Sequence, residues 1–389
     1  MQSVSNITDG GYMLSGGKSK GKSKITAAVE PDFPYEKLFL DEFGLDVEQE
    51  EEYYEQKAVK LRDDDKLAKY IGEGITPKAL CDKMVDYFAD RGLAMTEPDA
   101  RELIAAMVAS RILFVCTDDK QLFDDYVNAV GTFFGGEAAV RSAENISSDE
   151  EFLGEGEFAE IIEASALRHE TVRVAALDDV VPKNLGVFFT PFIRYAANPE
   201  NNRITYGNYA SGEKTITVAP NIWFAMRVSK ESAGEIPAHL ADISTLIMLD
   251  MARCDREEGV AEQTGVNYYK FVQAFERDDK FELDEQAWKR IDKLASYVNS
   301  KSPVAIANKM WIQMERMSAA YLAVGGDRDG ALDMIVCDKL LALFAPLIRG
   351  KLTRDDGDFA QALDNIFGDD GVSRAKSAAT KLGLTVARL

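Results

Sequence analysis

The stretch Arg111-Ile-Leu-Phe-Val-Cys116 decides the fold class. It is a short apolar run bounded by charged residues, and such a run is typical of a strand that is buried on both faces of a sheet. A helical pattern over about residues 97–109 leads directly into it, and a polar helical pattern over residues 120–130 follows it. The sequence therefore predicts a buried strand between two helices, as in an α/β fold.

Two further apolar runs extend this pattern. One covers residues 172–177 and ends in Asp178-Asp179, and the other covers residues 221–229 after a long connection rich in Asn and Gly. Helices and connections between such runs favour an open, mostly parallel sheet. The aromatic residues of these and neighbouring runs are predicted to lie in the core: Phe188, Phe189, Trp223 and Phe224.

The chain divides into three parts by composition and pattern. Residues 1–75 combine a basic arm rich in Gly, Ser and Lys with an acidic linker, and we expect the arm to be flexible. The α/β pattern occupies residues 76–255. Amphipathic helices then follow one another, with Gly-Gly-Asp-Arg-Asp-Gly at residues 325–330 as a turn between two of them, so residues 256–389 are predicted to form an α-helical domain.

Composition excludes several classes of protein. The 389 residues include 66 Asp and Glu against 45 Lys and Arg, a formal charge of −21, which disfavours a general nucleic-acid surface. The apolar runs are shorter than the ~20 residues that cross a bilayer, and no signal sequence is visible, so we expect a cytoplasmic protein without a membrane partner. Four separated cysteines and two histidines support neither a disulfide framework nor a metal site.

One stretch matches a nucleotide-binding motif. Residues 16–23, Gly-Gly-Lys-Ser-Lys-Gly-Lys-Ser, fit the phosphate-loop pattern GxxxxGK[ST]. That loop needs a buried strand before it and a helix after it, and the segment that follows here soon reaches Pro31 and Pro34. We therefore predict a chance match within a basic low-complexity arm, with phosphate binding as the alternative.

An ordered set of segments suggests a family. The set begins with Met-Val-Asp-Tyr-Phe-Ala-Asp-Arg-Gly-Leu and continues with an apolar strand, a strand that ends in two acids, a later strand and three helical segments, at residues 84–93, 100–115, 172–180, 187–192, 216–229, 236–243, 309–321, 326–333 and 339–350. In this order the segments resemble the AAA+ ATPase domain of the McrB-like clade, over about residues 76–375. The resemblance implies an AAA+-like parallel sheet flanked by helices, followed by an α-helical lid domain, and assembly into rings or arcs.

The residues that carry phosphate chemistry in that family are replaced here. The family has a Gly-rich loop after its first strand, whereas this chain has Thr117-Asp-Asp-Lys-Gln121 without a glycine. Lys120 is a weak remnant of the phosphate-binding lysine, and its alternative role is that of a solvated residue in the first turn of a helix. Asp178 and Asp179 stand where the family has Asp-Glu, which would hold Mg²⁺ and polarise water. Alternatively, they cap the end of a strand and the start of a helix.

Three later positions depart in the same way. The sensor 1 strand of the family ends in Thr-x-Asn, but this strand ends in Arg227-Val-Ser229. Residues 240–244 contain Asp242 and no arginine finger, and we expect this segment to face a neighbouring subunit. Lys309 stands in place of the sensor 2 arginine, so charge is kept but the bidentate fork is lost.

Together these replacements predict a degenerate AAA+ protein, a pseudo-ATPase. We expect no catalytic residue, no metal site and no cofactor, with protein partners that are copies of itself or an intact AAA+ subunit, and a role as a scaffold or regulatory subunit. Two alternatives stay open. The first is an active McrB-like motor that uses ATP or GTP with Mg²⁺ on nucleic acid, and the second is a self-assembling phage or virion protein built on the fold.

Overall fold

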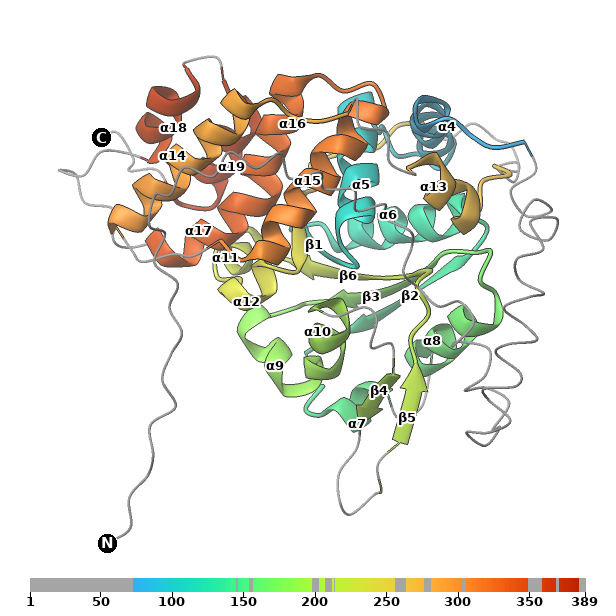
Figure 1. Ribbon diagram of the computed structural model, residues 1–389. Helices are drawn as coiled ribbons and strands as arrows, with labels where there is room; N and C mark the ends of the chain where they lie inside the picture. Colours follow the sequence, from blue (N-terminus) through green and yellow to red (C-terminus); the bar gives the residue numbers. More distant parts are fainter. Residues whose placement is uncertain are drawn as a thin grey trace, which may run out of the picture. The chain divides into compact units, whose positions relative to one another are not determined.

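Five parallel strands form a central sheet in the part of the chain that the structure describes (Figure 1). This structure is a computed structural model, and it describes residues 73–144, 146–153, 157–197, 203–206, 212, 214–255, 264–275, 281–301, 306–348, 359–368 and 371–384. The strand order is β2-β3-β6-β1-β7. The strands are β1 (Ile112–Cys116), β2 (Glu137–Ser142), β3 (Arg173–Asp178), β6 (Ile222–Val228) and β7 (Ser244–Met248).

The three apolar runs that predicted strands are β1, β3 and β6, which lie side by side in the sheet. The sequence analysis missed β2 and β7. Glu137, Arg141 and Ser142 give the edge strand β2 a polar, partly exposed character that hides its strand pattern. The predicted long connection before β6 also contains an antiparallel pair, β4 (Arg203–Tyr206) and β5 (Lys214–Thr217).

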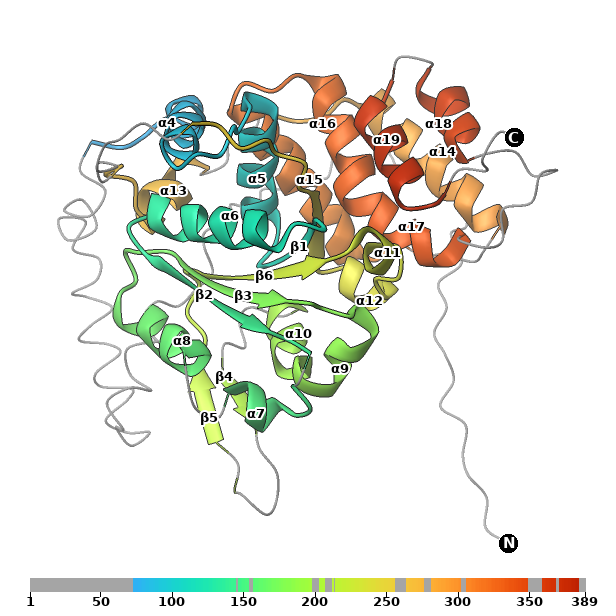
Figure 2. The same ribbon diagram turned by 180° about the vertical axis from the view of Figure 1, so that it is seen from behind.

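Helices cover both faces of the sheet (Figures 1 and 2). On one face lie α4 (Pro77–Asp90), α5 (Glu97–Ala109), α6 (Lys120–Phe133) and α13 (Tyr268–Ala274). On the other lie α7 (Asp149–Leu153), α8 (Glu157–Leu167), α9 (Leu185–Phe188) and α10 (Thr190–Ala197). Short elements near the ends of β3 and β6 are η1 (Pro182–Asn184), α11 (Lys230–Ala233) and α12 (Ala238–Ala241).

Two neighbouring residues of β6 show how the sheet separates its cores. Successive side chains of a strand point to opposite faces, so Trp223 packs in the cluster formed with α4, α5, α6 and α13, whereas Phe224 packs in the other. The indole N–H of Trp223 donates to the carbonyl oxygens of Met107 and Ser110, both at 3.1 Å. The core placement predicted for Phe188, Phe189, Trp223 and Phe224 is confirmed, because all four are buried.

The C-terminal part of the described chain is helical, as predicted. Its elements are α14 (Glu285–Lys301), α15 (Asn308–Ala323), α16 (Arg328–Ile335), the π-helical turn η2 (Val336–Leu340), α17 (Leu341–Ile348), α18 (Phe359–Phe367) and α19 (Ser373–Lys381). Gly325, with φ of 91°, makes the predicted turn between α15 and α16. α15 packs against α5 and η2 packs against β7, so this helical region is fixed to one side of the sheet.

All described residues belong to one compact unit, and one hydrophobic cluster continues from the sheet into the helical region. The boundary at residues 255 and 256 therefore stays a prediction. The basic arm and acidic linker lie outside the described residues, apart from residues 73–75. Among the helices that the structure describes, none has both the length and the apolar character to cross a membrane.

Gly136, between α6 and β2, lies against the backbone of Val172, the residue before β3. A Cβ atom at this position would lie 1.7 Å from the carbonyl oxygen of Val172, and backbone has to move to make room for it. We expect Gly136→Ala to lower the free energy of unfolding by about 1–3 kcal/mol or more. Gly186→Ala is the control, because a Cβ there meets nothing within 4 Å, and it should be neutral or slightly stabilising. Equal losses in chemical denaturation would contradict the prediction.

Candidate functional site

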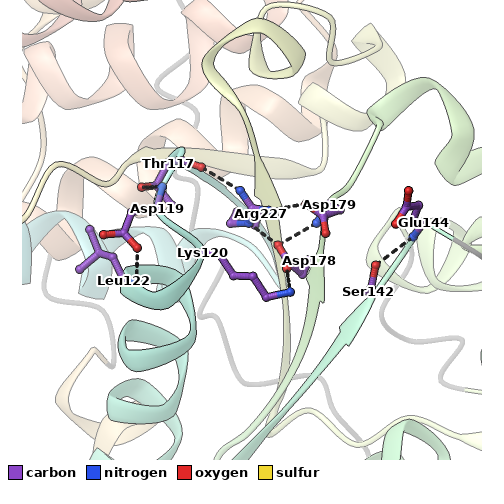
Figure 3. Close-up of polar contacts among 9 residues, drawn as sticks. All are labelled: Thr117, Asp119, Lys120, Leu122, Ser142, Glu144, Asp178, Asp179 and Arg227. Atoms are coloured by element: carbon purple, nitrogen blue, oxygen red, sulfur yellow. Dashed lines mark hydrogen bonds and ion pairs between the residues drawn. The ribbon is translucent and has the colours of Figure 1, made fainter.

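The carboxyl ends of β1, β3 and β6 meet at one edge of the sheet. In parallel α/β sheets this edge is where ligands bind. The ends are held together by backbone hydrogen bonds, because the Thr117 N–H donates to the Val228 carbonyl and the Val180 N–H donates to the Arg227 carbonyl, each at 3.1 Å. The three segments that carry the sequence-predicted site residues are thus adjacent in space (Figure 3).

A loop of residues 117–119 joins β1 to α6. Asp119 is the N-cap of α6, and its Oδ1 accepts a hydrogen bond from the Leu122 N–H at 2.9 Å. The Asp119 N–H in turn donates to the Thr117 hydroxyl at 3.2 Å. The first turn of a helix is where amide groups bind phosphate. Here the chain's own carboxylate binds an amide of that turn.

The two predicted acids follow each other at the end of β3. Asp178 is buried, with a side chain that is 1% exposed, and its Oδ1 accepts a hydrogen bond from the Asp179 N–H at 2.8 Å. Asp179 has φ of 53°, in the left-handed region that Asp tolerates better than most residues. Neither residue is the N-cap of a described helix, so that alternative is not supported; their partners are cations instead.

Arg227 is the residue of this candidate site whose contacts the sequence analysis missed. It comes from β6, the strand between β1 and β3, and its side chain is 11% exposed. Nε contacts the Asp178 carboxylate and Nη2 contacts the Asp179 carboxylate, while Nη1 reaches the Thr117 carbonyl oxygen at 3.4 Å (Figure 3). The guanidinium therefore joins the ends of three strands.

A signal for Arg227 is present in the sequence. The residue ends an otherwise apolar run, Ile222-Trp-Phe-Ala-Met-Arg227, and an acidic pair ends another run. A buried charge of this kind requires a partner of opposite sign. Only the strand order shows that these two ends are neighbours, and periodicity in one sequence does not give that order.

Lys120 completes the group. It begins α6, and its Nζ lies 2.5 Å from Asp178 Oδ2, with a side chain that is 59% exposed. Burial opposes ionisation of Asp178, but hydrogen bonds from Lys120, Arg227 and the Asp179 N–H outweigh it, so the pKa of Asp178 is lowered. The weak remnants Lys120, Asp178 and Asp179 are therefore brought together. With Arg227 they form a group of two carboxylates and two cations, whose charges cancel.

The other predicted positions lie elsewhere. Lys309 is exposed near the start of α15. Residues 240–244 were expected to face a neighbouring subunit; four of these five residues are buried and Asp242 is partly buried, and the contact with a subunit stays a prediction. Lys339 of η2 contacts this segment, because its Nζ donates to the carbonyl oxygens of Ala241 and Ser244 and to Gln313 Oε1. The stretch at residues 16–23 lies outside the described residues.

Replacing Arg227 tests the energetic role of this group. Arg227→Met keeps the length of the side chain and removes the charge, so two carboxylates lose their shared partner and the free energy of unfolding should fall by about 3 kcal/mol. In the wild type, the lowered pKa of Asp178 means that its contribution is present above the usual Asp range, near pH 4, and is lost on further acidification. The variant should therefore depend less on pH in that acidic range.

Lys230→Met is the matched control for this measurement. Lys230 pairs with Asp118 at 3.2 Å, and both side chains are at least half exposed, so the loss should stay below about 1 kcal/mol. Denaturant unfolding at neutral and acidic pH measures both variants. A loss in Arg227→Met that is no larger than in Lys230→Met would show that the ion pairs at the sheet edge do not hold the strand ends.

Comparison with known proteins gives this chain no family. No protein-family model matches it, and no curated protein matches it either. The structure shows a five-stranded parallel sheet between helices, with a helical C-terminal region. The resemblance of residues 76–375 to an AAA+ domain therefore stays a proposal.

Proposed function

We propose that this chain is a non-catalytic AAA+-like protein, a pseudo-ATPase that acts as a scaffold or regulatory subunit of a multi-protein assembly. One observation carries the proposal. Arg227 binds both Asp178 and Asp179, the two carboxylates that an ATPase of this type would use for Mg²⁺ and for water. A permanent cation of the protein thus occupies the acids that a nucleotide-bound metal ion needs.

The guanidinium of Arg227 keeps its contacts with Asp178 and Asp179 at every pH at which both acids are ionised. Arg stays protonated at any pH at which proteins are folded, so no change of acidity releases the acids. For Mg²⁺ to bind, both contacts of Arg227 and the contact of Lys120 with Asp178 must break. Arg227 would then remain nearly buried without a counterion, which is strongly unfavourable. The residues present therefore do not fit a magnesium nucleotide, and we derive no step of hydrolysis.

The loop before α6 supports the same conclusion. A triphosphate needs free amide groups and positive charge at this place. Asp119 binds one amide of the first turn, and Asp118 is a second negative charge whose partner is Lys230 of α11. Lys120 is engaged with Asp178. The groups at the edge of the sheet thus form contacts with one another that preserve the architecture.

The arrangement of the strands supports the AAA+ interpretation. The resemblance assigns the phosphate-loop strand to β1, the Walker B strand to β3 and the sensor 1 strand to β6. In the sheet, β6 lies between the other two. A sensor side chain in that position can reach both a phosphate loop and a metal-binding acid, which is the geometry that nucleotide hydrolysis requires. The chain keeps this geometry while its side chains form internal ion pairs.

Nucleotide binding is the direct test of the proposal. We expect neither a shift of the melting temperature nor a heat of binding with ATP or GTP and Mg²⁺ at millimolar concentration. Micromolar binding that Lys120→Ala abolishes would overturn the proposal in favour of an active motor. Lys183→Ala is the matched control, since Lys183 is an exposed lysine in η1 outside the ion-pair group. Binding that Lys22→Ala abolishes would assign the nucleotide to the N-terminal stretch instead.

Assembly state separates the scaffold from the self-assembling alternative. Light scattering of the purified chain distinguishes a monomer or small oligomer from a large homopolymer. A large homopolymer would favour the structural phage or virion protein. Co-purification with the products of neighbouring genes then tests for an intact ATPase partner, whose hydrolysis rate should change when this chain is added.

A further inference from the structure

Three charged residues from distant parts of the chain meet where the helical region joins α5. They are Glu102 of α5, Asp338 of η2 and Arg374 of α19. Glu102 and Asp338 are both buried, and an Arg374 Nη2 contact with Glu102 Oε2 joins α19 to α5 across 272 positions of sequence. This contact is separate from the sheet edge described above, and the inference does not depend on the proposed function.

Asp333 fixes the position of Arg374. The backbone N–H groups of Arg374 and Ala375 each donate to the Asp333 carboxylate at 2.9 Å, so α19 begins on an acid supplied by α16. The negative charge of Asp333 is thus held at the start of a helix, where the amide groups balance it. Arg374 is therefore the one cation that the structure places against both Glu102 and Asp338 among the described residues.

Asp338 lacks the contacts that an ionised carboxylate needs. Both of its carboxyl oxygens are buried, and within the described residues no cation donates to them; the groups within hydrogen-bonding reach are the Glu102 carboxyl and the Cys337 thiol. Glu102 has taken the guanidinium contact. Burying an unpaired carboxylate costs far more than burying the neutral acid, so such a group keeps its proton. Two carboxyls and one guanidinium are balanced when one proton remains.

We propose that Asp338 holds a proton at neutral pH and that this proton couples the helical region to α5 as a pH-sensitive latch. Loss of the proton places two negative charges together beside one Arg374, in a site without water access for Asp338. The helices that carry Asp338 and Arg374 then have to move away from α5 or admit water. The latch is closed at low pH and weakens as pH rises.

Burial and the neighbouring acid favour the protonated form of Asp338, whereas the charge of Arg374 and the Cys337 hydrogen bond oppose it. Burial and the Glu102 charge raise the pKa of Asp338 well above its usual value, and burial also raises the pKa of Glu102. The other titratable groups near Glu102, Asp338 and Arg374 are Asp99 of α5, Tyr126 of α6, Tyr321 of α15, Asp333 of α16 and Cys337 of η2, and none of these five can carry a positive charge. Asp250 lines a small cavity with Asp99, Glu102 and Tyr126, and it pairs with Lys381.

The π-helical turn explains why this site controls the joint. Asp338 and Lys339 are consecutive and both fully buried. Lys339 donates to the carbonyl oxygens of Ala241, the last residue of α12, and Ser244, the first residue of β7. Asp338 lies beside Glu102 of α5. Turns of this type are frequent at functional positions in helices. One turn of η2 therefore connects the helical region with both the sheet and α5.

The difference in proton binding between folded and unfolded protein determines whether stability rises or falls with pH. Unfolded Asp338 has a pKa of about 3.9, so above that pH the folded protein binds one proton more than the unfolded protein. The folding equilibrium constant should then fall tenfold for each pH unit, until the folded protein also loses the proton. Burial lowers the pKa of Lys339 to about 7 and lowers that of His169, and both contributions run in the opposite direction, so wild type alone does not isolate the latch.

The comparison of wild type with Asp338→Asn isolates it, because Asn has the same shape and does not titrate. We expect the ratio of their folding equilibrium constants to fall about tenfold per pH unit from about pH 5 upward, with the variant favoured at about pH 8. Asp292→Asn is the control, because Asp292 lies at an exposed position of α14. The ratio of the folding equilibrium constants of wild type and this variant should not change with pH. A flat ratio for Asp338→Asn would sink the proposal.

Two further measurements keep the test decisive if that variant does not fold. Glu102→Gln leaves one carboxyl beside Arg374 and should show the same pH-dependent ratio to wild type. Infrared spectra of wild type at neutral pH should contain the carbonyl stretch of a buried carboxylic acid that disappears on alkalinisation. In parallel, hydrogen exchange corrected for intrinsic rates should increase with pH in α19 and not in β1. Absence of the infrared band, or equal changes in α19 and β1, would overturn the latch.

Discussion

The double contact of Arg227 with Asp178 and Asp179 is the constraint on which the arrangement of the strand ends at the candidate site depends. It links the ends of β1, β3 and β6, the strands that also separate the two hydrophobic cores. Each group in the contact is nearly buried or forced into an uncommon conformation, as the left-handed backbone of Asp179 shows.

The fold could be predicted in outline because its central strands are buried on both faces. β1, β3 and β6 therefore appear as continuous apolar runs, and the amphipathic helices after residue 280 show their own period. β2 escaped prediction because its edge position permits Glu137 and Arg141, and the β4–β5 pair because alternating polar residues such as Arg203 and Thr205 resemble a loop. Exposure thus removes the signal that burial creates.

Of the candidate site, only the residue types could be predicted. The short acidic loop without glycine can be read from residues 117–121, but the pairing of Arg227 with Asp178 and Asp179 could not. Arg227 lies 49 positions from Asp178, and Glu102 lies 272 positions from Arg374, so both contacts depend on strand and helix order rather than on local pattern. The burial of residues 240–244 was missed for the same reason, since Lys339 reaches them from a helix almost 100 positions away.

The closed network at the sheet edge also has an evolutionary consequence. If Arg227 alone were replaced by an amide, the carboxylates of Asp178 and Asp179 would lose their shared partner. If glycines entered the loop first, the Asp119 cap would be lost while Arg227 still occupied the acids. Each of these single changes would therefore give a less stable protein. Under the function proposed above, selection for stable folding is by itself enough to keep these ion pairs in place.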